Sequence, residues 1–377
     1  MKRKLLITGI LLSLCTLAGL GGWWLRGQYS LDSGKFFLGT PEIKRPLVKY
    51  EIPAMQETSI ETGEFTITEL ITEQELYNAY LFEFVHYPDF DINNPKVTTG
   101  QINIPNVENF EDDELKNQLT TNGFPVMLLL RGFVSQEIYE TGIGSRNGSA
   151  YFASNGYITI APDFLGYAGS DGNAADIFES RFQTYTTALS TLEFIKTLNT
   201  SNAFEVASTL EVPPGLTLAK LGSVDTKNTF IWAHSNGGQI ALTVLEVTKG
   251  AYPTTLWAPV TKGFPYSVLY YTDESIDGGK YIRNELAQFE QLYDTDKFSV
   301  ENYFEHIQAP VQIHQGGNDD AIPLEWSNDF VRTLRNLDKD VTYYTYPEAD
   351  HNMRPSWDEE IQRDLEFFDE IRLGDET

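Results

Sequence analysis

A serine on a predicted sharp turn is the residue of this sequence best suited to chemistry. Ser235 lies within residues 230–242, where an apolar run leads through Ala233, His234, Asn236 and Gly237 into an apolar helical pattern. Such a strand–turn–helix exposes the serine hydroxyl on a strained bend, and the residues two before and two after it must be small. Alanine and glycine occupy those positions. A serine that merely caps the helix would give the same pattern.

A serine hydroxyl is a weak nucleophile unless a base removes its proton, so a histidine and an acid are needed as partners. The predicted strand 311–314 leads into a loop that carries Asp319, and the predicted strand 341–346 leads into His351. His351 is the only histidine after Asp319. The order serine, acid, histidine therefore predicts Ser235 as nucleophile, Asp319 as acid and His351 as base.

Other residues compete for these roles. Asp320 is the neighbouring candidate for the acid, but a strand followed by Gly-x-x-Asp-x-x-Ile-Pro favours Asp319. His234 directly precedes the nucleophile, and a tight turn would aim its ring away, so we expect it to pack beneath the turn. The remaining histidines, which we expect to be structural, are His86, His306 and His314.

Attack on a carbonyl creates an oxyanion, which two backbone N–H groups must stabilise. The first predicted donor is the N–H of Asn236, immediately after the serine. The second is the N–H of Phe133, in the loop Arg131-Gly132-Phe133-Val134 after the predicted strand 126–130. An ordinary turn at the end of that strand is the alternative interpretation.

Short apolar runs alternate with helical periods from residue 125 onward, a pattern typical of an α/β fold with a mostly parallel central sheet and helices on both faces. A single domain over residues 61–377 is predicted, with residues 261–306 as a small cap insertion over the carboxyl edge of the strands. The expected strands span residues 78–86, 97–104, 126–130, 157–161, 230–233, 254–258, 311–314 and 341–346. The expected helices span residues 184–198, 237–248, 323–337 and 357–371.

The N-terminus has the pattern of a membrane signal. Lys2, Arg3 and Lys4 precede an uncharged run over residues 5–25, which as a helix reaches about 30 Å, enough to cross a bilayer. The positive cluster predicts export of the rest of the chain, either membrane-anchored on the extracytoplasmic side or secreted. Because no small-x-small cleavage site comes after the run, residues 1–25 are predicted to be an uncleaved anchor rather than a removed signal peptide. Residues 26–60 are predicted to be a linker or stalk.

The composition narrows the function classes. A formal net charge of −27 repels phosphate backbones, so nucleic acid is not an expected partner. The only cysteine, Cys15, lies in the N-terminal apolar run, which excludes a cysteine nucleophile and thiolate zinc sites in the folded part. No metal or cofactor is predicted. Asp273, Glu274 and Asp277 in the predicted cap would suit a cationic group such as a peptide amino terminus, or simply remain solvated.

Together these residues resemble the catalytic domain of the prolyl oligopeptidase family, within the α/β-hydrolases. The resemblance spans residues 79–368 and rests on four blocks. These blocks are residues 101–127, residues 151–172, the turn at Ser235, and the loops of Asp319 and His351. It implies a stand-alone serine hydrolase that cleaves amide or ester bonds through an acyl-enzyme, as a serine peptidase or as a carboxylesterase.

Several departures from the family pattern bear on this expectation. Ala233 stands where glycine is usual, Arg131 where histidine is common, and Leu165 where arginine is common. Only about 100 residues precede the predicted sheet, too few for the β-propeller of the family's oligopeptidases, which favours an esterase. A non-catalytic binding module on the same fold is the alternative of another class, because a fold does not fix a function. The expected substrate is a small ester or a short peptide.

Overall fold

The computed structural model describes residues 44–198, 205–206, 224–272 and 275–374. The chain divides into two units, Met1–Lys44 and Arg45–Thr377, and the sheet with its covering helices belongs to the second. The predicted anchor over residues 1–25 and the first part of the predicted linker lie outside the described residues. No helix within the described ranges is both long enough and apolar enough to cross a membrane.

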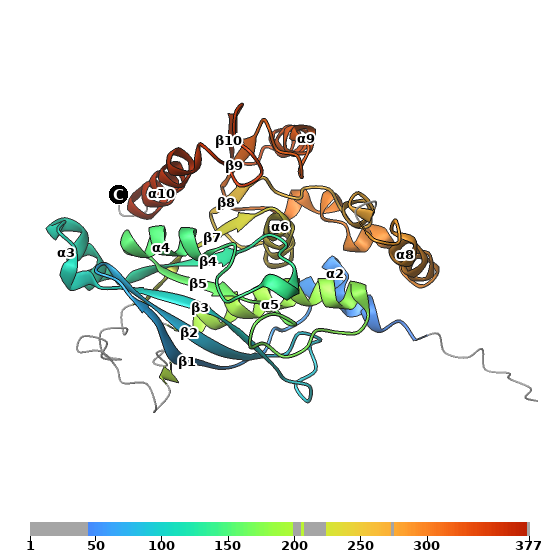
Figure 1. The fold of residues 1–377 in the computed structure, drawn as a ribbon, viewed down its shortest axis with the longest axis horizontal. Helices are drawn as coiled ribbons and strands as arrows, with labels where there is room; N and C mark the ends of the chain where they lie inside the picture. Colours follow the sequence, from blue (N-terminus) through green and yellow to red (C-terminus); the bar gives the residue numbers. More distant parts are fainter. Residues whose placement is uncertain (1–43, 199–204, 207–223, 273–274, 375–377) are drawn as a thin grey trace, which may run out of the picture. The chain divides into compact units, whose positions relative to one another are not determined.

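The described strands form one sheet in the order β10-β9-β8-β7-β4-β5-β3-β2-β1-β6 (Figure 1). Neighbours from β10 through β5 run parallel, whereas β5, β3, β2 and β1 pair antiparallel. This arrangement confirms the predicted α/β class. The strands are β1 (Thr62–Glu73), β2 (Tyr77–His86), β3 (Lys96–Pro105), β4 (Phe124–Leu130), β5 (Ile158–Pro162), β6 (Glu205–Val206), β7 (Val224–His234), β8 (Thr254–Trp257), β9 (Val311–Gly316) and β10 (Val341–Tyr346).

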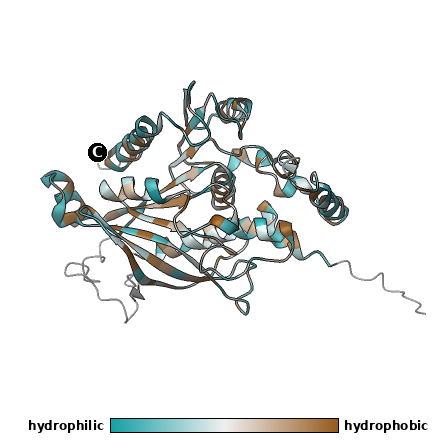
Figure 2. Ribbon diagram, in the orientation of Figure 1, coloured by the Kyte–Doolittle hydropathy of each residue, from teal (hydrophilic) through white to brown (hydrophobic). Residues whose placement is uncertain are grey.

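Helices cover both faces of this sheet, as expected (Figure 1). The longer helices are α3 (Asp113–Asn122), α4 (Arg146–Ser154), α5 (Ile177–Thr197), α6 (Asn236–Thr248), α8 (Lys280–Leu292), α9 (Leu324–Asn336) and α10 (Trp357–Gly374). Figure 2 shows largely apolar strands beside helices such as α10 that carry many hydrophilic residues. Strands and helices both supply the core, because α5 and α6 bury most of their residues while α10 keeps a hydrophilic face.

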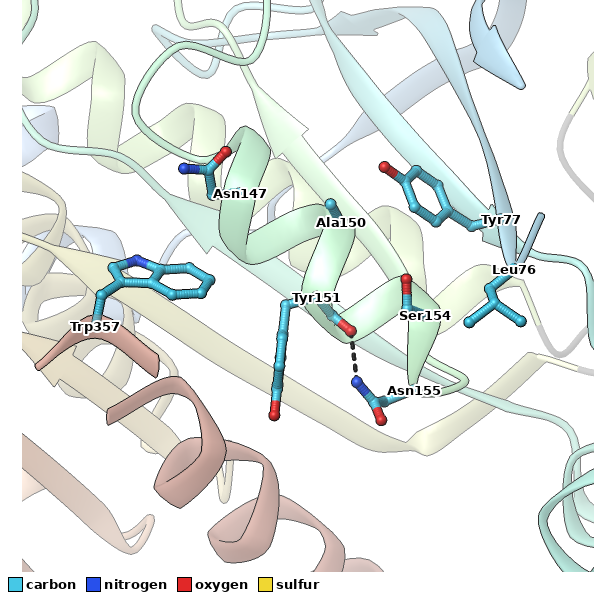
Figure 3. A pocket seen from close by; sticks show the side chains of 8 residues that line it. All are labelled: Leu76, Tyr77, Asn147, Ala150, Tyr151, Ser154, Asn155 and Trp357. Atoms are coloured by element: carbon cyan, nitrogen blue, oxygen red, sulfur yellow. Dashed lines mark hydrogen bonds between the residues drawn. The ribbon is translucent and has the colours of Figure 1, made fainter. Parts of the chain in front are cut away.

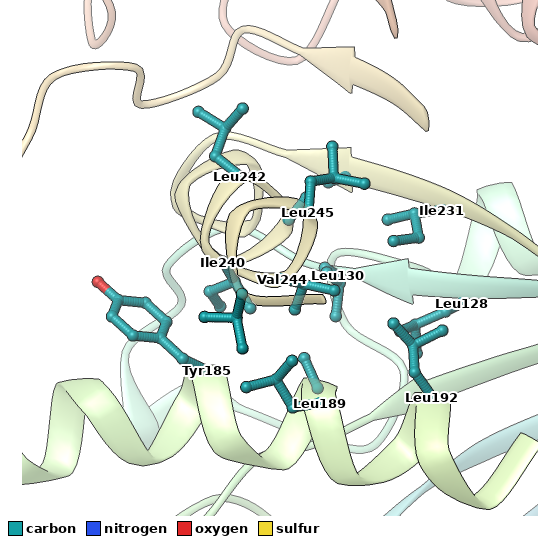
Figure 4. Close-up of a cluster of buried hydrophobic side chains, with 14 of the residues drawn as sticks. Leu128, Leu130, Tyr185, Leu189, Leu192, Ile231, Ile240, Leu242, Val244 and Leu245 are labelled. Atoms are coloured by element: carbon teal, nitrogen blue, oxygen red, sulfur yellow. The ribbon is translucent and has the colours of Figure 1, made fainter. Parts of the chain in front are cut away.

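The core consists of two layers, one on each face of the sheet, because strand side chains alternate between faces. Along β4, Val126 and Leu128 join one cluster, whereas Met127 and Leu129 join the other. The first cluster packs on α5, α6 and α9, and Figure 4 shows its leucine and isoleucine side chains meeting between β4, α5 and α6. The second packs on α4 and α10. Loss of one such leucine side chain would cost about 2–5 kcal/mol.

The predicted linker over residues 26–60 needs correction from Pro46 on. Here the chain forms a short 3₁₀ helix, η1 (Pro46–Tyr50), and then α2 (Ile52–Gln56). Each has a proline in its first turn, where proline starts a helix rather than breaking it. Their apolar side chains, Leu47, Tyr50, Ile52 and Met55, are buried in the first cluster. The folded unit therefore begins at Arg45 instead of residue 61.

The insertion between β8 and β9 is helical over its described part. It contains α7 (Tyr266–Leu269), α8 and three 3₁₀ turns, η5 (Thr295–Phe298), η6 (Val300–Asn302) and η7 (Phe304–His306). The ring centres of Phe264 and Phe178 of α5 lie 5.3 Å apart. The ring of Phe298 stacks on that of Phe182, with 5.0 Å between the ring centres. The insertion is thus fixed to α5 by aromatic contacts. Its role as a cap over the strand ends stays a prediction.

One buried acid has no obvious structural purpose. Glu246 of α6 is fully buried, and neither of its carboxyl oxygens has a hydrogen-bond partner among the described residues. Burial without a partner raises the pKa of this carboxyl well above its ordinary value. The folded protein therefore holds Glu246 protonated at pH values where the unfolded chain has it ionised.

We expect Glu246→Gln to be more stable than the parent protein, by an amount that grows with pH. In the parent, the free energy of unfolding falls as pH rises from the unfolded pKa, about 4.3, toward the raised folded pKa. The slope is about 1.4 kcal/mol per pH unit, and the amide cannot ionise, so it escapes this loss. Urea unfolding at pH 5, 6 and 7 measures the difference. Exposed Glu290→Gln is the control, and parallel curves for parent and Glu246→Gln would contradict the expectation.

Candidate active site

The turn between β7 and α6 holds Ser235 in a strained conformation, with φ 56° and ψ −119°. Its backbone is fixed on both sides, because its N–H donates to Trp257 O at 2.9 Å and its C=O accepts from the N–H groups of Gly238 and Val260. Gly237 lies against β4 so closely that a Cβ there would meet Leu130 O at 1.9 Å. Only glycine fits, which gives the small residue two after the serine its physical reason.

The structure brings His351 into contact with Ser235. Its Nε2 lies 3.0 Å from Ser235 Oγ, and its Nδ1 lies 3.0 Å from both Oδ1 and Oδ2 of Asp319. A carboxylate accepts hydrogen bonds, so Nδ1 carries the proton and Nε2 is left to accept one from the serine hydroxyl. The three side chains thus form a continuous hydrogen-bonded chain.

Asp319 is held by donors besides His351. Its Oδ1 accepts from the N–H groups of Ala321 at 2.9 Å and Ile322 at 2.8 Å, and its Oδ2 accepts from Gln315 Nε2 at 2.9 Å. Burial alone would raise the pKa of this carboxyl, but the hydrogen bonds from His351 and the two amides outweigh it and lower the pKa. Asp319 therefore stays ionised. Asp320 is exposed, so the structure brings Asp319, and not Asp320, to His351.

Adjacent parallel strands carry the acid and the histidine. Asp319 follows β9 and His351 follows β10, and these strands pair along their whole length, from Val341 beside Val311 to Tyr346 beside Gly316. Beyond the strands, the N–H of Gly317 donates to Tyr346 O at 2.8 Å and the N–H of Asn318 donates to Ala349 O at 3.0 Å. The two loops therefore leave the sheet edge together.

His234 does more than pack beneath the turn. Its Nε2 donates to the backbone carbonyl of His351 at 2.9 Å, and the two rings lie 4.8 Å apart. Burial first, and then the charge of His351, lower the pKa of His234 to about 4, so this ring is neutral near pH 7. It supports the loop of His351 without adding a charge.

The other three histidines lie in separate surroundings. His314 is fully buried, with Nε2 2.9 Å from Asp364 Oδ1 and Nδ1 2.8 Å from the Tyr346 hydroxyl. His86 contacts Thr98 at 2.8 Å, and His306 contacts Gln56. None of these contacts involves Ser235, in agreement with the structural role expected for all three.

Asn236 directly follows the serine, and the loop that carries Phe133 comes close to it at Gly132. Asn236 is the first residue of α6, and its N–H lies at the positive N-terminal end of that helix. Gly132, just before Phe133, lies so close that a Cβ there would be 2.9 Å from Ser235 Cβ. Phe133 is 77% exposed. The donor roles of Asn236 and Phe133 stay predictions.

The sequence did not predict the contacts of three residues that shape this site. His234 and Gln315 brace His351 and Asp319, and Gln315 is itself fixed by Ser327 Oγ, which donates to its Oε1 at 2.7 Å. Arg131 stands out in the sequence only as a departure from the family pattern, yet it is buried beside Gly132. Its place as the first residue of the predicted oxyanion loop was the available signal.

A surface hollow of about 590 Å³ lies elsewhere, along α4. Tyr77 and Trp357 border it together with α4 residues such as Asn147 and Tyr151 (Figure 3). It contains none of Ser235, Asp319 and His351, so it does not belong to this site.

The described part of the chain contains no group of His, Cys, Asp and Glu side chains placed to hold a metal ion. Asp277 accepts from the N–H groups of Gly279 at 2.9 Å and Tyr281 at 2.8 Å, where α8 begins. That carboxylate thus has a local structural role. Asp273 and Glu274 lie outside the described residues.

Comparison with known protein families gave a match for part of the chain. Residues 216–373, which include Ser235, Asp319 and His351, match the model of the prolyl oligopeptidase family. Comparison with curated protein sequences gave no match.

Several solved structures share the fold at low identity. A Bacteroides ovatus protein described as a dipeptidyl aminopeptidase IV is 13% identical with a TM-score of 0.53, over 78% of this chain and 36% of its own. Acetyl xylan esterase 1 of a Thermoanaerobacterium species is 15% identical with a TM-score of 0.52, over 85% of this chain and 92% of its own. Acetyl xylan esterase of a Paenibacillus species is 17% identical with a TM-score of 0.54, over 87% of this chain and 95% of its own.

These comparisons bear on the fold and the family separately. Likeness at such identities establishes the fold alone, and this chain spans only about a third of the Bacteroides protein. The comparisons establish the α/β-hydrolase fold for the chain, and the match over residues 216–373 relates that segment to the prolyl oligopeptidase family.

Proposed function

We propose that this serine hydrolase cleaves short acyl esters through an acyl-enzyme on Ser235, with His351 as general base and Asp319 as its orienting acid. One observation carries the proposal: Ser235 Oγ, the His351 ring and the Asp319 carboxylate are linked by contacts of 3.0 Å. The hydroxyl sits on a strained, half-buried turn, where a substrate carbonyl can approach it.

Acylation proceeds from this arrangement. Ser235 Oγ attacks the carbonyl carbon while its proton passes to His351 Nε2, and the ionised Asp319 stabilises the resulting imidazolium. The carbonyl oxygen becomes an oxyanion that accepts from the N–H groups of Asn236 and Phe133. When the intermediate collapses, the bond to the leaving group breaks and Nε2–H returns the proton to the departing oxygen.

Deacylation repeats these steps with water. His351 Nε2 takes a proton from a water molecule as its oxygen attacks the acyl carbon, and a second oxyanion forms in the same place. Collapse breaks the bond to Ser235 Oγ, which regains its proton from His351. The acid product then leaves, and the enzyme returns to its starting state.

A short peptide is the second candidate substrate. The match to the prolyl oligopeptidase family over residues 216–373 favours it. Against it, the chain covers 92% and 95% of the two acetyl xylan esterases but only 36% of the dipeptidyl aminopeptidase. The extent of these similarities supports the ester as the first candidate.

Ser235→Ala should lower kcat by roughly 10⁴-fold or more, because the variant loses the hydroxyl that attacks the substrate. Asp319→Asn should lower kcat by a factor of similar order. Asp320→Asn changes an exposed residue and should keep kcat near the parent value. Steady-state hydrolysis of p-nitrophenyl acetate measures all three. Equal losses in the two asparagine variants would refute the assignment of the acid.

A fluorophosphonate probe separates an enzyme from a non-catalytic binding module. The native protein should be labelled on Ser235, and heat-denatured protein and Ser235→Ala should not. Mass spectrometry of the labelled peptide identifies the residue. Native protein that resists the probe and hydrolyses no ester would end the enzymatic proposal.

Esters and peptides can be compared directly as substrates. We expect kcat/KM for p-nitrophenyl acetate and butyrate to exceed that for aminoacyl p-nitroanilides, because p-nitrophenolate departs more readily than the aniline nitrogen. Ser235→Ala is the control for both assays. Turnover of the anilides at rates equal to or above those of the esters would favour the peptide candidate.

We also propose that the chain is exported and held at a membrane by residues 1–25. The support is the sequence alone, namely Lys2, Arg3 and Lys4 before the uncharged residues 5–25. Expressed from its own start, the protein should remain in the membrane fraction after carbonate extraction. A variant that begins at Lys44 should be released.

A further inference from the structure

We propose that Arg131 is a positioning residue that sets the oxyanion-binding peptide between Gly132 and Phe133. The inference rests on the function proposed above and deepens it. It adds a side chain that touches no substrate but fixes the direction and strength of one backbone donor.

One peptide group connects Arg131 to the oxyanion. Arg131 Nη1 donates to Gly132 O at 2.9 Å, and this carbonyl shares a peptide plane with the N–H of Phe133. That peptide is trans, so its C=O and N–H point in opposite directions. The guanidinium engages one side of the plane, and the Phe133 N–H therefore faces the other. A rotation of the plane would break the bond to Arg131.

The same peptide lies beside the nucleophile. A Cβ on Gly132 would be 2.9 Å from Ser235 Cβ and 3.3 Å from His234 Nδ1. A side chain at this position would push the peptide away from the serine. Glycine permits the approach, but it also allows many backbone conformations, so something else must choose among them. Arg131 supplies that restraint.

Arg131 is itself held rigidly. Its side chain is buried, its Nη2 donates to Asp163 O at 2.8 Å, and its guanidinium carbon lies 4.4 Å from the ring centre of Tyr139 and 4.1 Å from that of Tyr167. Aromatic faces attract a guanidinium and restrict its rotation. With the ring centre of Phe164 at 5.4 Å, the cation is thus enclosed by three rings and two backbone carbonyls.

The enclosure continues into the surrounding loops. The Asp163 carboxylate accepts from the hydroxyls of Tyr139 at 2.6 Å, Thr99 at 2.7 Å and Thr141 at 2.8 Å. The Tyr167 hydroxyl donates to Val134 O at 3.0 Å, one residue beyond Phe133. Both ends of the segment from Gly132 to Val134 are therefore tied to the same rigid cluster.

The charge of Arg131 adds to its geometric effect. A cation that donates to a peptide carbonyl polarises the peptide, and the N–H on the other side becomes a stronger donor. Negative charge on the substrate oxygen exists only in the transition state and the tetrahedral intermediate. A stronger donor therefore speeds the chemical step and leaves substrate binding nearly unchanged.

The test compares Arg131→Met and Arg131→Lys with the parent on p-nitrophenyl acetate. Arg131→Met should lower kcat by about 10²-fold with KM within about threefold, the pattern of a lost transition-state interaction. Arg131→Lys keeps the charge without the planar fork, and it should lie between Arg131→Met and the parent. Affinity for a trifluoromethyl ketone, which forms an oxyanion on the serine, should fall in step with kcat/KM.

Arg363→Met is the matched control. Its guanidinium also stacks on two tyrosines, 4.3 Å from the ring centre of Tyr344 and 5.4 Å from that of Tyr346, and it lies on α10, away from the turn of Ser235. It should keep the parent values of kcat and ketone affinity. Thermal unfolding of every variant identifies any that fail to fold, and Arg131→Lys then decides the outcome.

Two results would overturn the inference while the proposed function stands. In one, the parent reacts with the fluorophosphonate and hydrolyses esters, but Arg131→Met keeps the kcat and the ketone affinity of the parent. The other is an Arg131→Met variant in which KM rises and kcat stays unchanged, the result expected if Arg131 has only a structural role. A parent that neither hydrolyses esters nor reacts with the fluorophosphonate would instead refute the proposed function itself.

Discussion

The bend at Ser235 is the constraint on which the rest of the site depends. A positive φ at a non-glycine residue costs on the order of 1–3 kcal/mol and persists only where the surroundings impose it. Here the bend is imposed by strands β8 and β4, by the first turn of α6 and by the segment that follows β8. The serine's N–H is bound to Trp257 at the end of β8, its C=O is bound by Gly238 and Val260, and Gly237 is pressed against Leu130 of β4. The sheet therefore holds the hydroxyl out at a cost in backbone strain.

Much of this fold could be predicted because a buried parallel strand is an unbroken apolar run. All seven residues of β4 are apolar and buried, and the predicted strand 126–130 matched it closely. β1 was not predicted because one of its faces is polar and half-exposed and it contains no such run. α4 was not predicted because it contains Gly148 and Ser149, which weaken a helical pattern. The prolines of η1 and α2 suggested a linker where they begin helices.

In the site too, some features could be predicted from the sequence and others could not. Chain order and loop composition selected Ser235, Asp319 and His351, and local spacing separated Asp319 from Asp320. The supporting contacts could not be predicted, since they join residues far apart in the chain. His234 reaches the carbonyl of His351, and Arg131 reaches Asp163 and two tyrosines. Such contacts depend on how loops fold over one another, and a single sequence carries no period or motif for them.

The strand order has a mechanical consequence for the three side chains. Asp319 and His351 extend from neighbouring strands that are hydrogen-bonded along their length, whereas Ser235 extends from β7, with β8 in between. A shear or twist of the sheet leaves the imidazole–carboxylate pair intact as one rigid body. Between Oγ, which follows β7, and Nε2, which follows β10, the same deformation accumulates across three strand interfaces. Heat or denaturant should thus misalign the nucleophile from its base well before the base loses its acid.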